Sequence, residues 1–389
     1  DQWATRPNDQ RFWTLEEMRR STAYSRASST EAAVDFDSAR FCLDRTGGNS
    51  LRFRWSEVDS VDPDRRGVES RVSHYAFGQL CRTFGAPASY LRDLPVQLAV
   101  DCLEEGRQRW IDGGDRDRQQ RRHTLFSGDE GGETSVLRAA TSDRYVRVWN
   151  DEIVERLIDL QGAGWRVPLA RPSGRVDPTR FRTATEEDII DYGHESALTV
   201  KVGDQIAPAG LYASDHDMFA FMIHPEVVIE DGLSPQGLRR GTMVRQSEVG
   251  DCAIWKLDFL FNTVCGNHIV WGAQDVSETR VRHTGATVGE RWTAMVRDLT
   301  EYSEDSARQQ EAKIREAQSF KLGDDRDAVI DFLYGKRIIG KRACGAALDL
   351  AEEFESVHGD PLSAWGVVQG ITRLSQATPF ADKRSKLDR

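Results

Sequence analysis

The side chains of this chain best suited to bind a ligand are basic residues interleaved with aromatic ones. Arginine pairs with a phosphate through two parallel hydrogen bonds, and an aromatic ring stacks on an unpaired base of any kind. This combination is typical of proteins that hold single-stranded nucleic acid. We therefore predict a nucleic-acid-binding site made of Arg239, Arg240, Arg245, Lys256, Trp271, Arg280, Arg282, Lys336, Arg337, Lys341 and Arg342.

Most of these residues belong to Gly237–Arg297, where lysine and arginine outnumber the acids although the whole chain has a formal net charge of −11. The glycines that bound Gly237–Gly241 predict a basic turn. Two strands should follow, Thr242–Gln246 and Ala253–Val264, joined by a turn at Glu248–Asp251. The second strand carries apolar side chains on both faces, which predicts a central strand covered on two sides.

Successive side chains of a strand point to opposite faces, so residues two apart share a face. Arg280 and Arg282 should therefore point the same way, and His283 should point to the other side as a structural residue. The four remaining basic residues of the predicted site fall in Gly335–Leu348, a segment without acids. By the same alternation, one buried face of the central strand should carry Trp255, Leu257, Phe259 and Phe261.

Three residues give an alternative site. Asp215, Asp217 and His224 resemble a metal-binding cluster, since carboxylates and imidazole bind divalent ions. A turn whose aspartates cap backbone amides accounts for the same residues, so the predicted site contains no metal. The phosphate-binding loop GxxxxGK[ST], the dinucleotide motif GxGxxG after a strand and the nucleophile motif GxSxG are all absent from the sequence. We predict no catalytic residue and no cofactor.

Length and composition describe a globular protein with room for one large or two ordinary domains. The chain has 389 residues, of which 39% are hydrophobic and 30% charged. No apolar run approaches the roughly 18 residues of a membrane span, and no signal peptide is recognisable. The six cysteines are scattered without a CxxC pair, which predicts free thiols in a reducing cytoplasm. The acidic balance argues against coating duplex DNA but allows a local basic groove.

The order of the predicted elements divides the chain into four parts. The first is an N-terminal α/β region whose helices are separated by Gly85 and Pro87. A flexible linker or loop follows, rich in glycine and mixed charge, and then a β-rich core. Predicted helices at Arg326–Phe332 and Arg342–His358 begin the last part. The boundaries are 1–111, 112–133, 134–323 and 324–389.

Several short motifs along nearly the whole chain resemble the phage and plasmid family DUF932, a domain of unknown function. They are Trp3-Ala-Thr-Arg-Pro7, Arg11-Phe12, His74-Tyr-Ala-Phe-Gly-Gln-Leu80, Ala86-Pro87, Tyr90, Val136-Leu137-Arg138, Asp143-Arg-Tyr145, Ser247-Glu-Val-Gly250, Val264-Cys-Gly-Asn267, Arg282-His-Thr-Gly285, Trp365-Gly and Thr372. The resemblance implies a mobile-element setting and brings no established reaction with it.

Together these observations predict an α+β protein, with an antiparallel-rich β-sheet core, flanking helices and a helical C-terminal region. The predicted function is single-strand DNA binding or annealing in replication or recombination of a phage or plasmid. We expect a homo-oligomer, no membrane association and no enzymatic activity. Two alternatives stay open: a metal-dependent enzyme acting on nucleic acid or nucleotides, and a non-enzymatic host-interaction protein.

Overall fold

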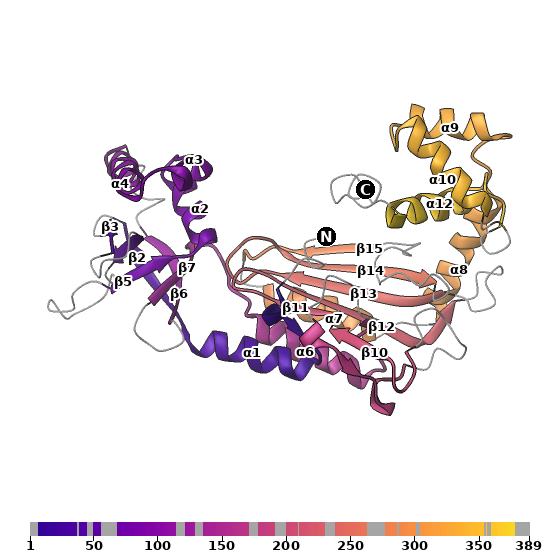
Figure 1. The fold of residues 1–389 in the computed structure, drawn as a ribbon, viewed down its shortest axis with the longest axis horizontal. Helices are drawn as coiled ribbons and strands as arrows, with labels where there is room; N and C mark the ends of the chain where they lie inside the picture. The colour runs from indigo at the N-terminus through magenta and orange to yellow at the C-terminus, as the bar shows by residue number, and fades with distance from the viewer. Residues whose placement is uncertain are drawn as a thin grey trace.

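The protein has the predicted α+β fold with antiparallel-rich sheets, and its described residues form two six-stranded sheets and a smaller one. Its structure is a computed structural model that describes residues 7–36, 39–44, 50–55, 68–113, 121–128, 135–170, 178–190, 200–208, 210–229, 238–262, 277–285, 288–300, 304–353, 355 and 359–377. The N-terminal sheet with its helices and the C-terminal helices lie at opposite ends of the central sheet, and both rise on the same side of it (Figure 1).

The central sheet has the strand order β1-β11-β12-β13-β14-β15, and all its pairings are antiparallel. Its strands are β1 (Arg11–Phe12), β11 (Leu211–Ala213), β12 (Met218–Ile229), β13 (Leu238–Gln246), β14 (Ile254–Asn262) and β15 (Ser277–Val281). The strand predicted to be central is β14, which is paired on both sides, with β15 as the edge. Gly250, at φ 83°, allows the predicted turn between β13 and β14.

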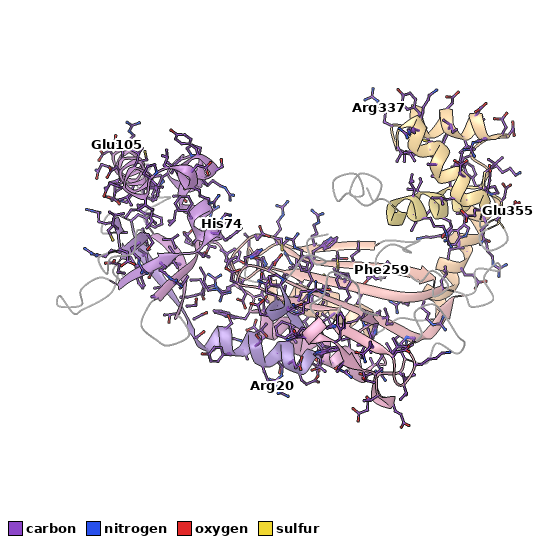
Figure 2. All side chains as sticks on the ribbon, in the orientation of Figure 1. Arg20, His74, Glu105, Phe259, Arg337 and Glu355 are labelled. Carbon is purple, nitrogen blue, oxygen red and sulfur yellow. The ribbon has the colours of Figure 1, made fainter. Side chains whose placement is uncertain are left out.

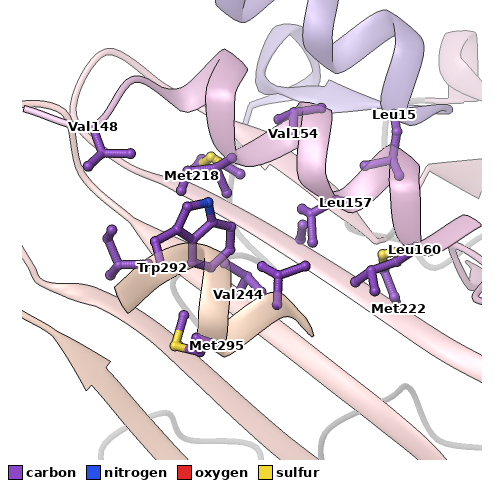
Figure 3. Close-up of a cluster of buried hydrophobic side chains, with 14 of the residues drawn as sticks. Leu15, Val148, Val154, Leu157, Leu160, Met218, Met222, Val244, Trp292 and Met295 are labelled. Carbon is purple, nitrogen blue, oxygen red and sulfur yellow. The ribbon is translucent and has the colours of Figure 1, made fainter. Parts of the chain in front are cut away.

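Three helices cover one face of the central sheet: α1 (Leu15–Ala27), α6 (Asn150–Gly162) and α7 (Val288–Thr300). Thr14 caps α1 by accepting a hydrogen bond from the Glu17 backbone N–H at 3.1 Å. The buried side chains of these helices meet those of the sheet in one core (Figure 3). Apolar burial on this scale is the main force that holds the helices on the sheet.

The opposite face of the central sheet carries an aromatic cluster. Phe219, Phe221 and Tyr212 pack there with Met243, Leu257 and Phe259, all of them buried. Trp255, also predicted to be buried, is only partly so, and the side chain of Phe261 lies outside the described ones. The central sheet is therefore covered on both faces, as its apolar side chains on both sides of β14 predict.

The N-terminal sheet has the order β2-β6-β7-β5-β4-β3. Its strands are β2 (Ser29–Asp35), β3 (Arg40–Leu43), β4 (Leu51–Trp55), β5 (Val68–Val72), β6 (Arg121–Gly128) and β7 (Ser135–Ser142). The helices α2 (His74–Thr83), α3 (Ala88–Asp93) and α4 (Val96–Asp112) pack on it around a second core. Ser73 caps the start of α2 by accepting a hydrogen bond from the Ala76 N–H at 3.1 Å. Gly85, just after the end of α2, has the left-handed φ of 70° that is common where helices end.

Two predicted boundaries are wrong. Part of the predicted linker 112–133 is the strand β6, in which Thr124 and Leu125 are fully buried. The boundary at 134 fails too, because β7 pairs with β6 and belongs to the N-terminal sheet. The reason is non-local: β2 and β7 hydrogen-bond to β6 from both sides, and this pairing orders a segment whose own composition is that of a loop.

A small three-stranded sheet and a set of C-terminal helices complete the fold. The small sheet has the order β8-β10-β9, from β8 (Leu169–Ala170), β10 (Gln205–Pro208) and β9 (Arg182–Thr183). The C-terminal helices are α8 (Glu304–Ser319), α9 (Arg326–Gly335), α10 (Lys341–Glu353) and α12 (Ala364–Ala377). None of the helices in the described ranges is long and apolar enough to cross a membrane.

Candidate nucleic-acid interface

The predicted basic turn at Arg239 and Arg240 is instead part of strand β13. Arg239 is 2% exposed, and its Nε donates to the Pro225 carbonyl at 3.1 Å. Arg240 is 8% exposed, and its guanidinium lies 5.4 Å from the centre of the Trp165 ring. Adjacent strand residues point to opposite faces, and here both faces are covered. Neither arginine can reach a phosphate on the surface, so this part of the predicted site is wrong.

Arg245, which is partly exposed, and Lys256, which is buried, are both neutralised by carboxylates. The Nη2 atom of Arg245 lies 2.9 Å from a carboxylate oxygen of Asp251 and 3.6 Å from one of Asp217. Lys256 is buried, and its Nζ lies 2.7 Å from Asp258. A buried cation needs such a counter-charge, because desolvation is costly. These two residues stabilise the sheet and are not available to bind phosphate.

The predicted alternation at the end of β15 is confirmed. Arg280 and Arg282 are exposed, whereas Val281 and His283 are buried. His283 Nδ1 lies 3.2 Å from the Val146 carbonyl oxygen, and its ring stacks on Tyr145. Burial lowers the pKa of His283 to about 4, so the imidazole is neutral at neutral pH. Trp271 lies outside the described residues.

The other four predicted residues lie together on the turn between α9 and α10. We define the α9–α10 tip as residues Phe332–Arg342. Lys336, Arg337, Lys341 and Arg342 are all exposed there, together with Phe332 at 38%, Tyr334 at 53% and Ile338 at 52%. Figure 2 labels Arg337 at the end of the C-terminal helices that is remote from the sheet. The tip thus presents cations and rings on a protruding turn.

The charges of the tip are largely unneutralised. Lys341 pairs with Asp331, with Nζ 2.7 Å from the carboxylate. Lys336, Arg337 and Arg342 make no ion pair with any described residue. The ammonium groups of the two lysines lie near exposed rings, Lys336 at 5.8 Å from Phe332 and Lys341 at 5.2 Å from Tyr334. The local field at the tip is therefore positive in an acidic chain.

Arg337 has an unusual backbone conformation. Its φ of 58° is in the left-handed region, where glycine is favoured after a helix. The Ile338 N–H donates to the Leu333 carbonyl at 3.0 Å, which is the hydrogen bond that closes this type of helix end. A side chain other than glycine here costs roughly 1 kcal/mol. An arginine held in such a position at an exposed turn is a reason to suspect a function.

The tip is held on a rigid support. Val329 and Leu333 of α9 pack with Cys344 and Leu348 of α10 and with Val367 of α12. At the other end of the hairpin, Arg326 pairs with Asp349 and with Glu352, and Asp325 caps α9. These interactions fix the angle between α9 and α10, and with it the position of the basic turn.

The alternative metal site is not assembled. Asp217 directly precedes β12 and His224 lies seven residues further on, roughly 23 Å away along an extended strand. Asp217 instead accepts from the Ser214 hydroxyl at 2.9 Å, and His224 Nε2 lies 3.1 Å from the Ala163 carbonyl oxygen. Within the described ranges no group of three or more His, Cys, Asp or Glu side chains is arranged to hold a metal ion.

The sequence prediction did not include Phe332 and Tyr334, the two rings of the tip. The signal was available in the helical periodicity of α9. Val329 and Leu333 are four apart and face the core, which turns the neighbouring positions 332 and 334 outward. Both rings therefore lie beside the predicted basic residues on the same exposed surface.

Comparison of the chain with protein-family models, with curated proteins and with solved structures gave no match. The function of the protein must therefore be inferred from its own surface chemistry.

Proposed function

We propose that this protein binds single-stranded nucleic acid, with the α9–α10 tip as the principal contact and the exposed Arg280 and Arg282 at the end of β15 as a second one. The observation that carries the proposal is the tip, where three cations without acidic partners among the described residues share one turn with two exposed rings. Cations neutralise phosphates and release their counterions, and rings stack on bases.

Two features of the tip favour a single strand over a duplex. Phe332 and Tyr334 are exposed at the end of α9, where a flexible strand can bring its bases onto them. The bases of a duplex are already stacked on one another and present only their edges. The acidic balance of the chain also opposes a long duplex lying across the molecule, while a strand can follow a short basic surface.

The setting of this activity is part of the same proposal. The motifs similar to DUF932 support a role in replication or recombination of a phage or plasmid, and annealing of complementary strands is the specific form we favour. Annealing by the homo-oligomer predicted from the sequence would place several tips along one strand. Several tips bound to one strand raise the overall affinity through a high effective concentration, although each tip binds as it would alone.

The test is the binding of a fluorescent oligonucleotide to the full chain, measured by anisotropy at several salt concentrations. The parent should bind single strands more tightly than duplex of equal length. The variant Lys336→Ala/Arg337→Ala/Arg342→Ala should bind more weakly. A plot of the logarithm of its binding constant against the logarithm of the salt concentration should be less steep by about two, because each of three neutralised phosphates of a single strand contributes about 0.7 to the slope. The matched control is Arg19→Ala/Arg144→Ala/Arg156→Ala, which removes three exposed cations elsewhere and should keep the parent's slope.

Absence of binding by the parent at about 50 mM salt, where the attraction of cations to phosphate is strong, contradicts the proposal. Equal weakening in the two triple variants would mean that overall charge, and not the tip, attracts the strand. Anionic vesicles serve as a second ligand, since basic and apolar side chains also bind acidic lipid surfaces. Tip-dependent binding to vesicles but not to oligonucleotides would assign the tip to a membrane surface.

A further inference from the structure

A cavity of about 580 Å³ opens between the N-terminal segment and the small sheet. Its walls come from residues 9–13, the first turns of α1 and residues 179–182. Three half-buried aromatic side chains line it, Phe12, Trp13 and Phe181, together with four arginines and two acids. This volume suits a small organic ligand. The excess of arginine over acid calls for a ligand with negative charge.

Two of the arginines are used by the fold. Arg182 forms an ion pair with Asp188, and its guanidinium lies 4.4 Å from the centre of the Trp13 ring. This pairing lowers the pKa of Asp188 to about 2. Arg11 is 3% exposed and lies 5.0 Å from the centre of the Tyr212 ring. Both guanidinium groups form part of the wall of the cavity, and that of Arg182 packs on its Trp13 ring.

The other two arginines are available to a ligand. Arg20 is exposed on α1, labelled on the underside of the molecule in Figure 2, and makes no hydrogen bond or ion pair with any described residue. Arg180 is half-buried and donates from Nη2 to the Arg11 carbonyl at 2.7 Å. Its Nε is buried and has no acceptor among the described residues. A buried donor without an acceptor is uncommon and indicates a missing partner.

The acids of the cavity do not neutralise these two arginines. Glu17 accepts from the Trp13 backbone N–H at 2.8 Å, at the start of α1. Asp9 is exposed and forms no ion pair with a described residue. An anion bound between Arg20 and Arg180 would therefore meet guanidinium groups whose hydrogen-bonding capacity is largely unused, and guanidinium pairs best with phosphate or carboxylate.

We infer that this cavity binds a nucleoside 5′-phosphate, with the phosphate at Arg20 and Arg180 and the base against the aromatic wall that includes Phe181. Phosphate is favoured over carboxylate because it has enough oxygens to accept from two guanidinium groups at once. Such a group occurs on a free nucleotide and at the 5′ end of a strand. The inference does not depend on the tip, since a free nucleotide can bind here whatever the tip does.

The test is a titration of the full chain with AMP and UMP by calorimetry, beside adenosine and inorganic phosphate as the two halves of the ligand. Both nucleotides should bind, and both halves should bind at least about tenfold more weakly, since each lacks one half of the interactions. Arg20→Ala and Arg180→Met should each weaken nucleotide binding by about tenfold or more. Arg19→Ala is the matched control, because Arg19 is the exposed neighbour on α1 that does not line the cavity.

A second arm compares oligonucleotides with and without a 5′-phosphate. A preference for the phosphorylated end that disappears in Arg20→Ala would identify a strand end as the occupant. The variant Lys336→Ala/Arg337→Ala/Arg342→Ala should keep its nucleotide binding, which separates this site from the tip. If Arg180→Met does not fold, Arg20→Ala alone decides.

Any of three results would overturn the inference. The first is that neither nucleotide nor the phosphorylated oligonucleotide binds at about 1 mM, the weak end of specific binding. The second is that inorganic phosphate binds as tightly as AMP, and the third is that Arg19→Ala weakens binding as much as Arg20→Ala does.

Discussion

Arg138 of β7 and Glu248 of the turn between β13 and β14 form an ion pair that joins the N-terminal sheet to the central one. Their Nη2 and Oε2 atoms are 3.0 Å apart, and the side chains are 5% and 1% exposed. The other Glu248 oxygen accepts from the Asn150 backbone N–H at 2.7 Å, and Arg138 also donates to the Asp215 carbonyl at 2.9 Å. Nearby, the amide nitrogen of Gln79 donates to the Val249 carbonyl at 2.8 Å.

Removing one partner of this pair should destabilise the protein strongly. Arg138→Met leaves a buried carboxylate without its counter-charge, and we expect a decrease of about 3–5 kcal/mol in the free energy of unfolding. Urea unfolding measures it, with the exposed Arg144→Met as the control. Glu248→Gln should cost less in the Arg138→Met background than in the parent, because the two changes share one interaction. A decrease below about 1 kcal/mol for Arg138→Met, as at an ordinary surface site, would contradict this role.

The aromatic face of the central sheet is tightly fitted at Gly241. This glycine of β13 lies opposite Phe259 of β14, and a Cβ at position 241 would overlap the Phe259 ring. Phe259→Ala should cost roughly 3–5 kcal/mol in unfolding free energy, as large-to-small core changes do. Gly241→Ala should also destabilise, but much less in the Phe259→Ala background, where the methyl group has room. Equal costs of Gly241→Ala in both backgrounds would disprove the close packing of these two residues.

Arg280 and Arg282, at the end of β15, should contribute to binding separately from the tip. Arg280→Ala/Arg282→Ala should lower the affinity for a labelled single strand. The slope of the logarithm of the binding constant against the logarithm of the salt concentration should become less steep by about 1.4. His283→Gln should bind with the parent's slope, since His283 is buried against Val146. The opposite pattern, with the slope changed only by His283→Gln, would mean that the two faces of this segment are reversed.

His283 should make stability depend on pH. Its pKa is about 4 in the folded protein and near its ordinary 6.5 when unfolded, so the unfolded chain takes up a proton first as the pH falls. The stabilisation is complete above about pH 6.5 and is lost between there and about pH 4, by up to roughly 3 kcal/mol. Unfolding free energies measured at several pH values should therefore fall more steeply in the parent than in His283→Gln. Parallel pH profiles would exclude this contribution.

Arg337 should lower the stability of the protein and strengthen its binding to single strands. Arg337→Gly removes the strain of a left-handed backbone, and we expect a gain of about 0.5–1 kcal/mol in unfolding free energy. The same variant should bind single strands more weakly, since it lacks a cation of the tip. Arg342→Gly, on the helical side of the turn, should weaken binding and also lower stability. A destabilised Arg337→Gly would show that the backbone conformation at 337 is supported by the side chain itself.

The sequence by itself determined the features that depend on local pattern. The capped starts of α1 and α2 follow from Thr14 and Ser73, whose side chains accept from backbone N–H groups three residues on. The same kind of local rule, alternation along a strand, separated Arg280 and Arg282 from His283. Composition also predicted a basic segment between the last helices, because Gly335–Leu348 has four basic residues and no acid.

Only the tertiary structure decided which basic residues reach the surface and which segments form a sheet. Arg239, Arg240 and Lys256 have the same side-chain chemistry as the basic residues of the tip, but the layers on both faces of the central sheet bury them. β6 is ordered by strands that are distant in sequence, and the cavity at Arg20 and Arg180 joins positions about 160 residues apart in the chain. Burial and pairing are properties of the packing between such distant segments, and no local pattern records them.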